Sequence, residues 1–322
     1  FMMQTVAHFM VQSGSRFMPD ELSVPQHRHL LKPEYCLFSV RNRLHYSASE
    51  AKPLKAFWEI LRPFNCLMAS AAAMIGLALA GGMQLEPAAL IFIIVFLVTG
   101  AGNAINDYYD REIDAINRPA RPIPSGRISP PAAFRYSVAL FIAGCLLAWW
   151  INPICLILAA CNSALLFLYA RNLKAMPLSG NITVAFLTGS TFLFGGAAVG
   201  MQGLLANLIP FFLSFLVSMS REIAKDIEDM AGDVAGGART LPILAGERIS
   251  RALAAGFALT AIALSFLPPL GKGYLAVVAV ADILFLLSVK KILQADATGA
   301  QKALKKGMAV ALVAFLAGAL LP

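Results

Sequence analysis

The stretch NAINDYYDREIDAINRPARPIPSG, residues 103–126, follows directly after a long apolar run and carries four polar side chains at regular spacing: Asn103, Asp107, Asp110 and Asp114. On an α-helix, which turns by about 100° per residue, these side chains fall within roughly 60° of one another. We therefore expect one face at the end of a membrane-length segment to carry three carboxylates and an amide.

A second stretch, REIAKDIEDMAGDVAGGARTLPI, repeats the D-x2-D-x3-D spacing with Asp226, Asp229 and Asp233. In each copy an apolar segment ends in the acidic face and continues into a loop with Gly, Arg and Pro. Residues 87–126 and 204–243 are therefore interpreted as a weak internal repeat, which is common in membrane folds. Two acidic faces in an otherwise apolar protein predict divalent metal ions bound between them.

The composition is that of a membrane protein. Of the 322 residues, 58% are hydrophobic and only 14% are charged, more apolar surface than a soluble domain of this size can bury. The five cysteines contain no CxxC pair, so neither disulfides nor zinc sites are predicted. The net charge of +8 is attributed to membrane orientation, and nucleic-acid binding is not expected.

Nine apolar segments are long enough, or nearly so, to cross a bilayer, which takes about 20 helical residues. They lie roughly at 57–80, 87–106, 132–151, 153–170, 179–200, 204–222, 250–268, 274–291 and 303–321. The sequence thus predicts an all-α protein with nine transmembrane helices in residues 52–322. Residues 1–51 are predicted to be a flexible N-terminal extension.

The distribution of basic residues predicts the orientation. Of the 26 Lys and Arg residues, all but Lys272 lie before or at the start of the first segment or beside the connections that follow even-numbered segments. By the positive-inside rule, the N-terminus and both acidic stretches lie on the cytoplasmic side of the cell membrane.

Carboxylates gathered near one cavity repel each other unless cations neutralise them. Ligands that are oxygen atoms only, with no His or Cys nearby, favour Mg²⁺, which keeps open positions for water and phosphate oxygens. A diphosphate bridged between the two stretches by metal is the expected ligand. The basic residues available to share its charge are Arg118, Arg121, Lys225 and Arg239.

The two motifs, NDYYDREIDAINRPARPIPSG and KDIEDMAGD followed by GARTLPI, resemble the UbiA superfamily of intramembrane prenyltransferases. The resemblance implies a helical bundle around a lipid-open central cavity, capped on the cytosolic side by the two motif loops. It also implies that Mg²⁺, as two ions, assists the loss of diphosphate from an isoprenyl diphosphate. The resulting allylic carbocation would alkylate a lipophilic acceptor inside a cavity that excludes water.

The resemblance assigns roles to individual residues. It implies metal ligands at Asn103, Asp107, Asp110, Asp114, Asp226, Asp229 and Asp233. It implies catalytic roles for Asp107, Asp110, Asp226, Asp229, Lys174 and Tyr169. It implies substrate contacts by Arg62, Asn65, Asn103, Arg118, Arg121, Lys225, Asn181 and Arg239. Glu222 departs from the first motif, which has Asn103 at that place, and is either a metal ligand or a partner of Lys225.

The acceptor is open at this point. The motifs resemble most the superfamily members that attach a second geranylgeranyl chain to geranylgeranylglyceryl phosphate in archaeal ether-lipid synthesis. The alternative with the same fold is an aromatic acceptor from quinone, haem or chlorophyll synthesis. A divalent-cation transporter is a third hypothesis, but its carboxylates would be expected near the bilayer midplane. Asp282, within the eighth segment, is left outside the site.

Overall fold

The computed structural model describes residues 53–320 except 83 and 236, and this part of the chain contains helices and no strand. The prediction of an all-α fold is confirmed for these residues. The predicted N-terminal extension, residues 1–51, lies outside them.

Thirteen α-helices and one short 3-10 helix follow one another in the described residues. They are α3 (Pro53–Ile60), α4 (Pro63–Leu79), α5 (Leu85–Tyr109), α6 (Arg111–Asn117), α7 (Pro130–Ile151), α8 (Pro153–Arg171), η1 (Leu173–Ala175), α9 (Ser179–Ala197), α10 (Met201–Ala206), α11 (Leu208–Ala235), α12 (Leu241–Ala245), α13 (Glu247–Leu264), α14 (Gly271–Leu293) and α15 (Ala297–Leu320).

Each predicted apolar segment coincides largely with one long helix of the described chain: α4, α5, α7, α8, α9, α11, α13, α14 or α15. Four of these helices, α5, α7, α8 and α15, are long and apolar enough to cross a membrane by themselves. A fifth candidate is the bent pair formed by α3 and α4. The structure therefore supports a multi-pass membrane protein.

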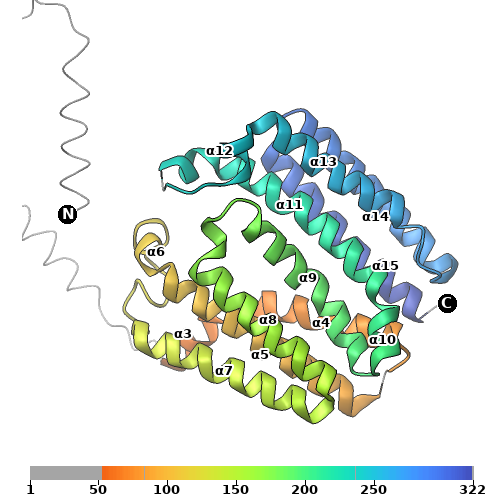
Figure 1. Ribbon diagram of the computed structural model, residues 1–322, viewed down its shortest axis with the longest axis horizontal. Helices are drawn as coiled ribbons and strands as arrows, with labels where there is room; N and C mark the ends of the chain where they lie inside the picture. The colour runs from red at the N-terminus through yellow and green to blue at the C-terminus, as the bar shows by residue number, and fades with distance from the viewer. Residues whose placement is uncertain (1–52, 83, 236, 321–322) are drawn as a thin grey trace, which may run out of the picture. The chain divides into compact units, whose positions relative to one another are not determined.

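Helices that are neighbours in sequence are also neighbours in space (Figure 1). Packed pairs run from α4 and α5 through α7, α8, α9, α11, α13 and α14 to α15, and α15 packs back on α4. Contacts of α4 with α9, and of α11 with α15, join the two halves of this closed series.

The contact between α4 and α9 depends on glycine. A Cβ atom added at Gly195 would lie 1.9 Å from the carbonyl oxygen of Ala73, and one at Gly76 would lie 2.4 Å from that of Phe192. Small residues at such positions let two helix backbones approach closely, as is common between membrane helices.

The first predicted span is broken. α3 and α4 meet at an angle of 52°, and Arg62 between them has φ 52° and ψ 67°, in the left-handed region. Pro63, the first residue of α4, has no N–H to donate, and a proline disfavours helical geometry at the residue before it. For a residue with a side chain this conformation costs roughly 1–2 kcal/mol, so contacts nearby must hold it.

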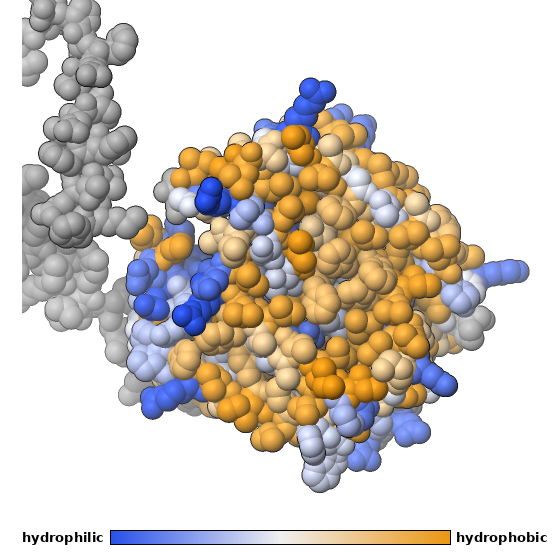
Figure 2. Space-filling model, in the orientation of Figure 1, coloured by the Kyte–Doolittle hydropathy of each residue, from blue (hydrophilic) through white to orange (hydrophobic). Residues whose placement is uncertain are grey.

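Apolar side chains cover much of the face shown in Figure 2, with polar ones gathered mainly at its edges. Large exposed apolar residues occur on many helices, among them Ile142, Trp149, Phe212, Leu253 and Leu286. An exposed apolar surface of this kind fits a protein surrounded by lipid. The short helices α6 and α12, which follow the two acidic stretches, lie at the same end of the bundle in Figure 1.

Candidate functional site

The first acidic stretch spans the end of α5, the break after it and α6. Asp107 is 4% exposed and accepts hydrogen bonds from Arg62 at 2.5 Å and from Arg121 at 3.2 Å. Arg121 also binds Asp114, which is 6% exposed. Because an isolated buried carboxylate is costly, these two guanidinium groups explain how both aspartates are tolerated.

Asp110 lies at the break itself. The predicted continuous helix over residues 103–114 stops at Tyr109, and Asp110 ends α5 and precedes α6 with φ −86° and ψ 0°. Its carboxylate accepts from Asn106 at 2.8 Å and pairs with Lys174, which lies in η1. The loop between α8 and α9 is thereby fixed to the first stretch. The catalytic role of Lys174 stays a prediction.

The second acidic stretch lies on α11, which continues unbroken through it to Ala235. Asp226 accepts from the Asn181 amide at 2.8 Å, and Glu222, 8% exposed, pairs with Arg221 at 2.5 Å. The sequence left open whether Glu222 is a metal ligand or a partner of Lys225, and the observed partner is Arg221.

Asp229 is exposed and Asp233 is half-buried, near the end of α11 and beyond the predicted span 204–222. Burial and the Asp229 carboxylate raise the pKa of Asp233 above its ordinary value, and Lys225 opposes this shift. A cation held at this helix end would offset the repulsion between the two carboxylates.

The two stretches are linked through the segment that joins α8 to α9. Lys174 in η1 pairs with Asp110 of the first stretch, and Asn181 near the start of α9 donates to Asp226 of the second. η1 and the start of α9 are in direct contact, since a Cβ atom added at Gly180 would lie 3.1 Å from the Lys174 Cα. Tyr169, partly buried near the end of α8, comes four residues before η1.

Other predicted site residues are placed differently. Asn65, Arg118, Lys225 and Arg239 are exposed, and among the described residues none of their side chains makes a hydrogen bond or an ion pair. Asn103 donates its amide N–H to the Leu61 carbonyl at 2.7 Å, and among the described residues its side chain makes no hydrogen bond to a carboxylate.

Two contacts were not anticipated from the sequence. Arg127 forms a forked ion pair with Glu59 at 2.5 and 2.9 Å, which connects α3 to the loop after α6. Asn106 holds Asp110, as described above. Asn106 carries a sequence signal, because it precedes Asp110 by one helical turn. Glu59 and Arg127 are far apart in sequence and carry none.

No group of three or more His, Cys, Asp or Glu side chains within residues 53–320, as far as these are described, is arranged to hold a metal by itself. The atoms available as metal ligands are carboxylate oxygens, and several of these carboxylates already pair with Arg or Lys side chains. Such a set suits Mg²⁺, which is usually held by one or two carboxylates and by substrate phosphates.

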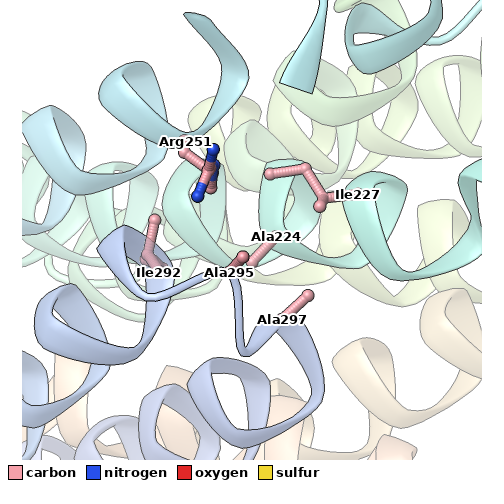
Figure 3. A pocket seen from close by; sticks show the side chains of 6 residues that line it. All are labelled: Ala224, Ile227, Arg251, Ile292, Ala295 and Ala297. Carbon is pink, nitrogen blue, oxygen red and sulfur yellow. The ribbon is translucent and has the colours of Figure 1, made fainter. Parts of the chain in front are cut away.

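A small pocket lies between α11, α13 and the turn from α14 to α15 (Figure 3). It is lined by Ala224, Ile227, Arg251, Ile292, Ala295 and Ala297, and its volume is about 10 Å³. That is room for about one water molecule, so this pocket is not a substrate site.

The UbiA prenyltransferase family matches residues 67–317. A protein from Methanothrix thermoacetophila named digeranylgeranylglyceryl phosphate synthase is 55% identical over 262 residues, covering 81% of this chain and 97% of that protein. Among solved structures, one from work on digeranylgeranylglyceryl phosphate synthase in membranes is 39% identical, with a TM-score of 0.74, and covers 83% of this chain and 99% of that one.

A UbiA homologue from Archaeoglobus fulgidus, solved bound to GPP and Mg²⁺, has a TM-score of 0.59 at 17% identity. The likeness covers 82% of this chain and 98% of that one, and at this identity it shows a shared fold.

Proposed function

The chain belongs to the UbiA prenyltransferase family, and from this membership and the geometry of its two motifs we propose that it transfers a geranylgeranyl group from geranylgeranyl diphosphate to geranylgeranylglyceryl phosphate. In this reaction the bond between the allylic carbon and the diphosphate oxygen breaks. A bond from that carbon to the acceptor's hydroxyl oxygen forms, and the hydroxyl proton is released. The product carries a second ether-linked chain.

The observation that carries this proposal is the link between both acidic stretches, in which Lys174 pairs with Asp110 and Asn181, seven residues later, donates to Asp226. A membrane protein has no structural need for so many carboxylates at the ends of two apolar helices. The choice of acceptor rests on the name borne by relatives that are 55%, 48% and 47% identical over more than four-fifths of this chain.

We propose that two Mg²⁺ ions are held at this site, one by each motif. The ligands would come from Asp107, Asp110 and Asp114 on one side and from Asp226, Asp229 and Asp233 on the other. When bound, Mg²⁺ neutralises the negative charge of the leaving diphosphate. The Mg²⁺ bound in the Archaeoglobus fulgidus homologue supports this choice of metal.

The chain's own residues bind and orient the diphosphate. Arg62, Arg121 and Lys174 lie beside the first-motif carboxylates and carry positive charge where diphosphate oxygens would arrive. Asn181 orients Asp226. The exposed Arg118, Lys225 and Arg239 belong to the same two motifs and would meet the polar substrate groups as they enter from water.

The bundle also has to keep water away from the allylic cation. Its helices bury apolar side chains such as Ile91, Ile94, Phe194 and Met219. An apolar interior open to lipid would house the isoprenoid chains of donor and acceptor while excluding water from the reacting carbon.

We further propose that all nine long helices span the membrane, with the N-terminus and the active site on the cytoplasmic side. The four helices that qualify by themselves, together with the bent pair, support part of this arrangement. The basic residues beside the connections that follow even-numbered segments support this orientation.

A product assay tests the proposed reaction. Purified protein is incubated with labelled geranylgeranyl diphosphate and Mg²⁺, with geranylgeranylglyceryl phosphate in one tube and 4-hydroxybenzoate in another. We expect an ether lipid in the first tube and none after the metal is removed with EDTA. A prenylated ring instead would replace the acceptor by an aromatic one. Divalent-cation flux in vesicles without any prenylated product would favour a transporter.

A further inference from the structure

Asn103 is close to the metal-binding residues in sequence, but in the structure it contacts the backbone at the break between α3 and α4. Its amide nitrogen lies 2.7 Å from the Leu61 carbonyl oxygen, and the Cys66 thiol lies 3.1 Å from the same oxygen. Both donors therefore meet a single buried carbonyl.

The Leu61 carbonyl needs such donors because the helix is interrupted there. In an unbroken helix it would accept from the N–H of Asn65, but the N–H groups of Asn65 and Cys66 both bond to the Arg62 carbonyl. Leu61 is 4% exposed, so water does not readily replace the missing donor.

Arg62 follows directly after this carbonyl, in the left-handed conformation, and its guanidinium donates to Asp107 at 2.5 Å. Asn103 and Asp107 are four residues apart on α5 and so lie one above the other on the same face. Two residues of that face therefore fix Arg62. Asn103 binds the backbone carbonyl before it, and Asp107 binds the guanidinium at the end of its side chain.

We infer that Asn103 is a positioning residue for Arg62: as a hydrogen-bond donor to the Leu61 carbonyl, it sets the backbone from which the Arg62 guanidinium reaches Asp107 and the diphosphate. This role depends on the amide N–H, whereas a metal ligand depends on the amide oxygen. The inference rests on the proposed function for its substrate and differs from the metal-ligand role that the sequence suggests.

Asn103→Asp separates the two roles, because aspartate keeps the ligand oxygen and loses the donor. We expect kcat/KM to fall at least ten-fold, with the Mg²⁺ concentration for half-maximal activity unchanged. Affinity for an unreactive thiolo analogue of geranylgeranyl diphosphate should fall together with activity. Full activity, or a changed Mg²⁺ requirement at unchanged analogue affinity, would overturn the inference.

A double-mutant cycle tests whether Asn103 acts through Arg62. In an Arg62→Ala background, Asn103→Asp should cost less than about three-fold in analogue affinity, because the side chain that it positions is gone. Losses that multiply in full would contradict this role. Asn103→Ala, which puts no charge beside the Leu61 carbonyl, allows the same cycle if the aspartate variant does not fold.

Asn152→Asp is the matched control. Asn152 also donates its amide to backbone carbonyls of another helix, at 2.9 Å to Ala197, but from the start of α8. It should lower thermal stability and leave analogue affinity unchanged. The binding of the analogue requires no acceptor. The affinity measurements therefore test the role of Asn103 even if the true acceptor is a different molecule. Absence of product from the unaltered protein with either acceptor would count against the proposed function alone.

Discussion

Asp107 receives two guanidinium groups although it is almost entirely buried, and Asp282 is just as buried with a single hydroxyl partner, Ser265 at 2.8 Å. Asp107 and Asp282 therefore allow a comparison of the same substitution at two buried carboxylates.

Asp107→Asn removes the charge that holds Arg62 and Arg121 and that would bind metal. We expect turnover to fall at least 100-fold, on the order of what loss of one electrostatic group costs an active site. The amount of product formed per enzyme molecule and unit time, at saturating substrate, measures this turnover.

Asp282→Asn makes the same chemical change inside α14. Its carboxylate accepts from Ser265, whose carbonyl accepts from the Tyr274 hydroxyl at 2.7 Å, and no residue of either motif takes part. We expect turnover to stay within about two-fold of the unaltered protein, whatever the change in thermal stability. Equal losses in Asp107→Asn and Asp282→Asn would contradict the assignment of the site.

For single residues, the sequence predicted one helical face with Asp107, Asp110 and Asp114, whereas the structure breaks the helix at Asp110. The site roles of these residues stay predictions, and the spacing did not indicate their pairing partners. It could not show that Asn103 points to Leu61, because that contact depends on a left-handed residue that no periodicity encodes.

At the scale of helices, the close contact of α4 with α9 leads to a stability prediction. A Cβ atom at Gly195 would overlap the Ala73 carbonyl, so the two helices must separate in Gly195→Ala. We expect a loss of about 1–3 kcal/mol, the usual cost of overpacking. The midpoint of thermal unfolding in detergent measures it.

Gly256→Ala is the control for that measurement. Gly256 lies within α13, and a Cβ atom there would meet nothing within 4 Å. Alanine is the better helix former by about 0.8–1 kcal/mol, so the midpoint should rise or stay the same. A fall as large as that of Gly195→Ala would show that the contact between α4 and α9 is not the cause.

Helix positions followed from hydropathy, but helix breaks did not. The hydropathy of the run at 57–80 did not predict the 52° bend between α3 and α4, although the run contains Pro63, at which α4 begins. The stop after Tyr109 depends on Asp110 binding Asn106 and Lys174, and Lys174 comes from a distant loop. Pro63 is a local cause of the first break, whereas the contacts of Asp110 and those of Leu61 join residues far apart in sequence, which a hydropathy pattern does not reveal.

At the scale of the whole molecule, the proposed orientation predicts which side of the membrane each connection faces. In a background without the five cysteines, Asn117→Cys and Gln202→Cys each place one thiol at an exposed position, at the end of α6 and in α10. A thiol reagent that does not cross membranes should label Cys at 117 only in inside-out vesicles and Cys at 202 only in right-side-out vesicles. Labelling of both from one side would contradict an odd number of helices between them.

The order in which the helices pack has a consequence for how the chain is made. Each long helix from α5 to α15 meets the helix that left the ribosome just before it, so the bundle can assemble pair by pair during synthesis. The carboxylates of both acidic stretches have all been made once residue 233 has been inserted, before α13, α14 and α15 exist. The contacts of α15 with α4, α11 and α14 must wait for the last helix. Synthesis of the last three long helices therefore completes a bundle whose metal-binding carboxylates are already present.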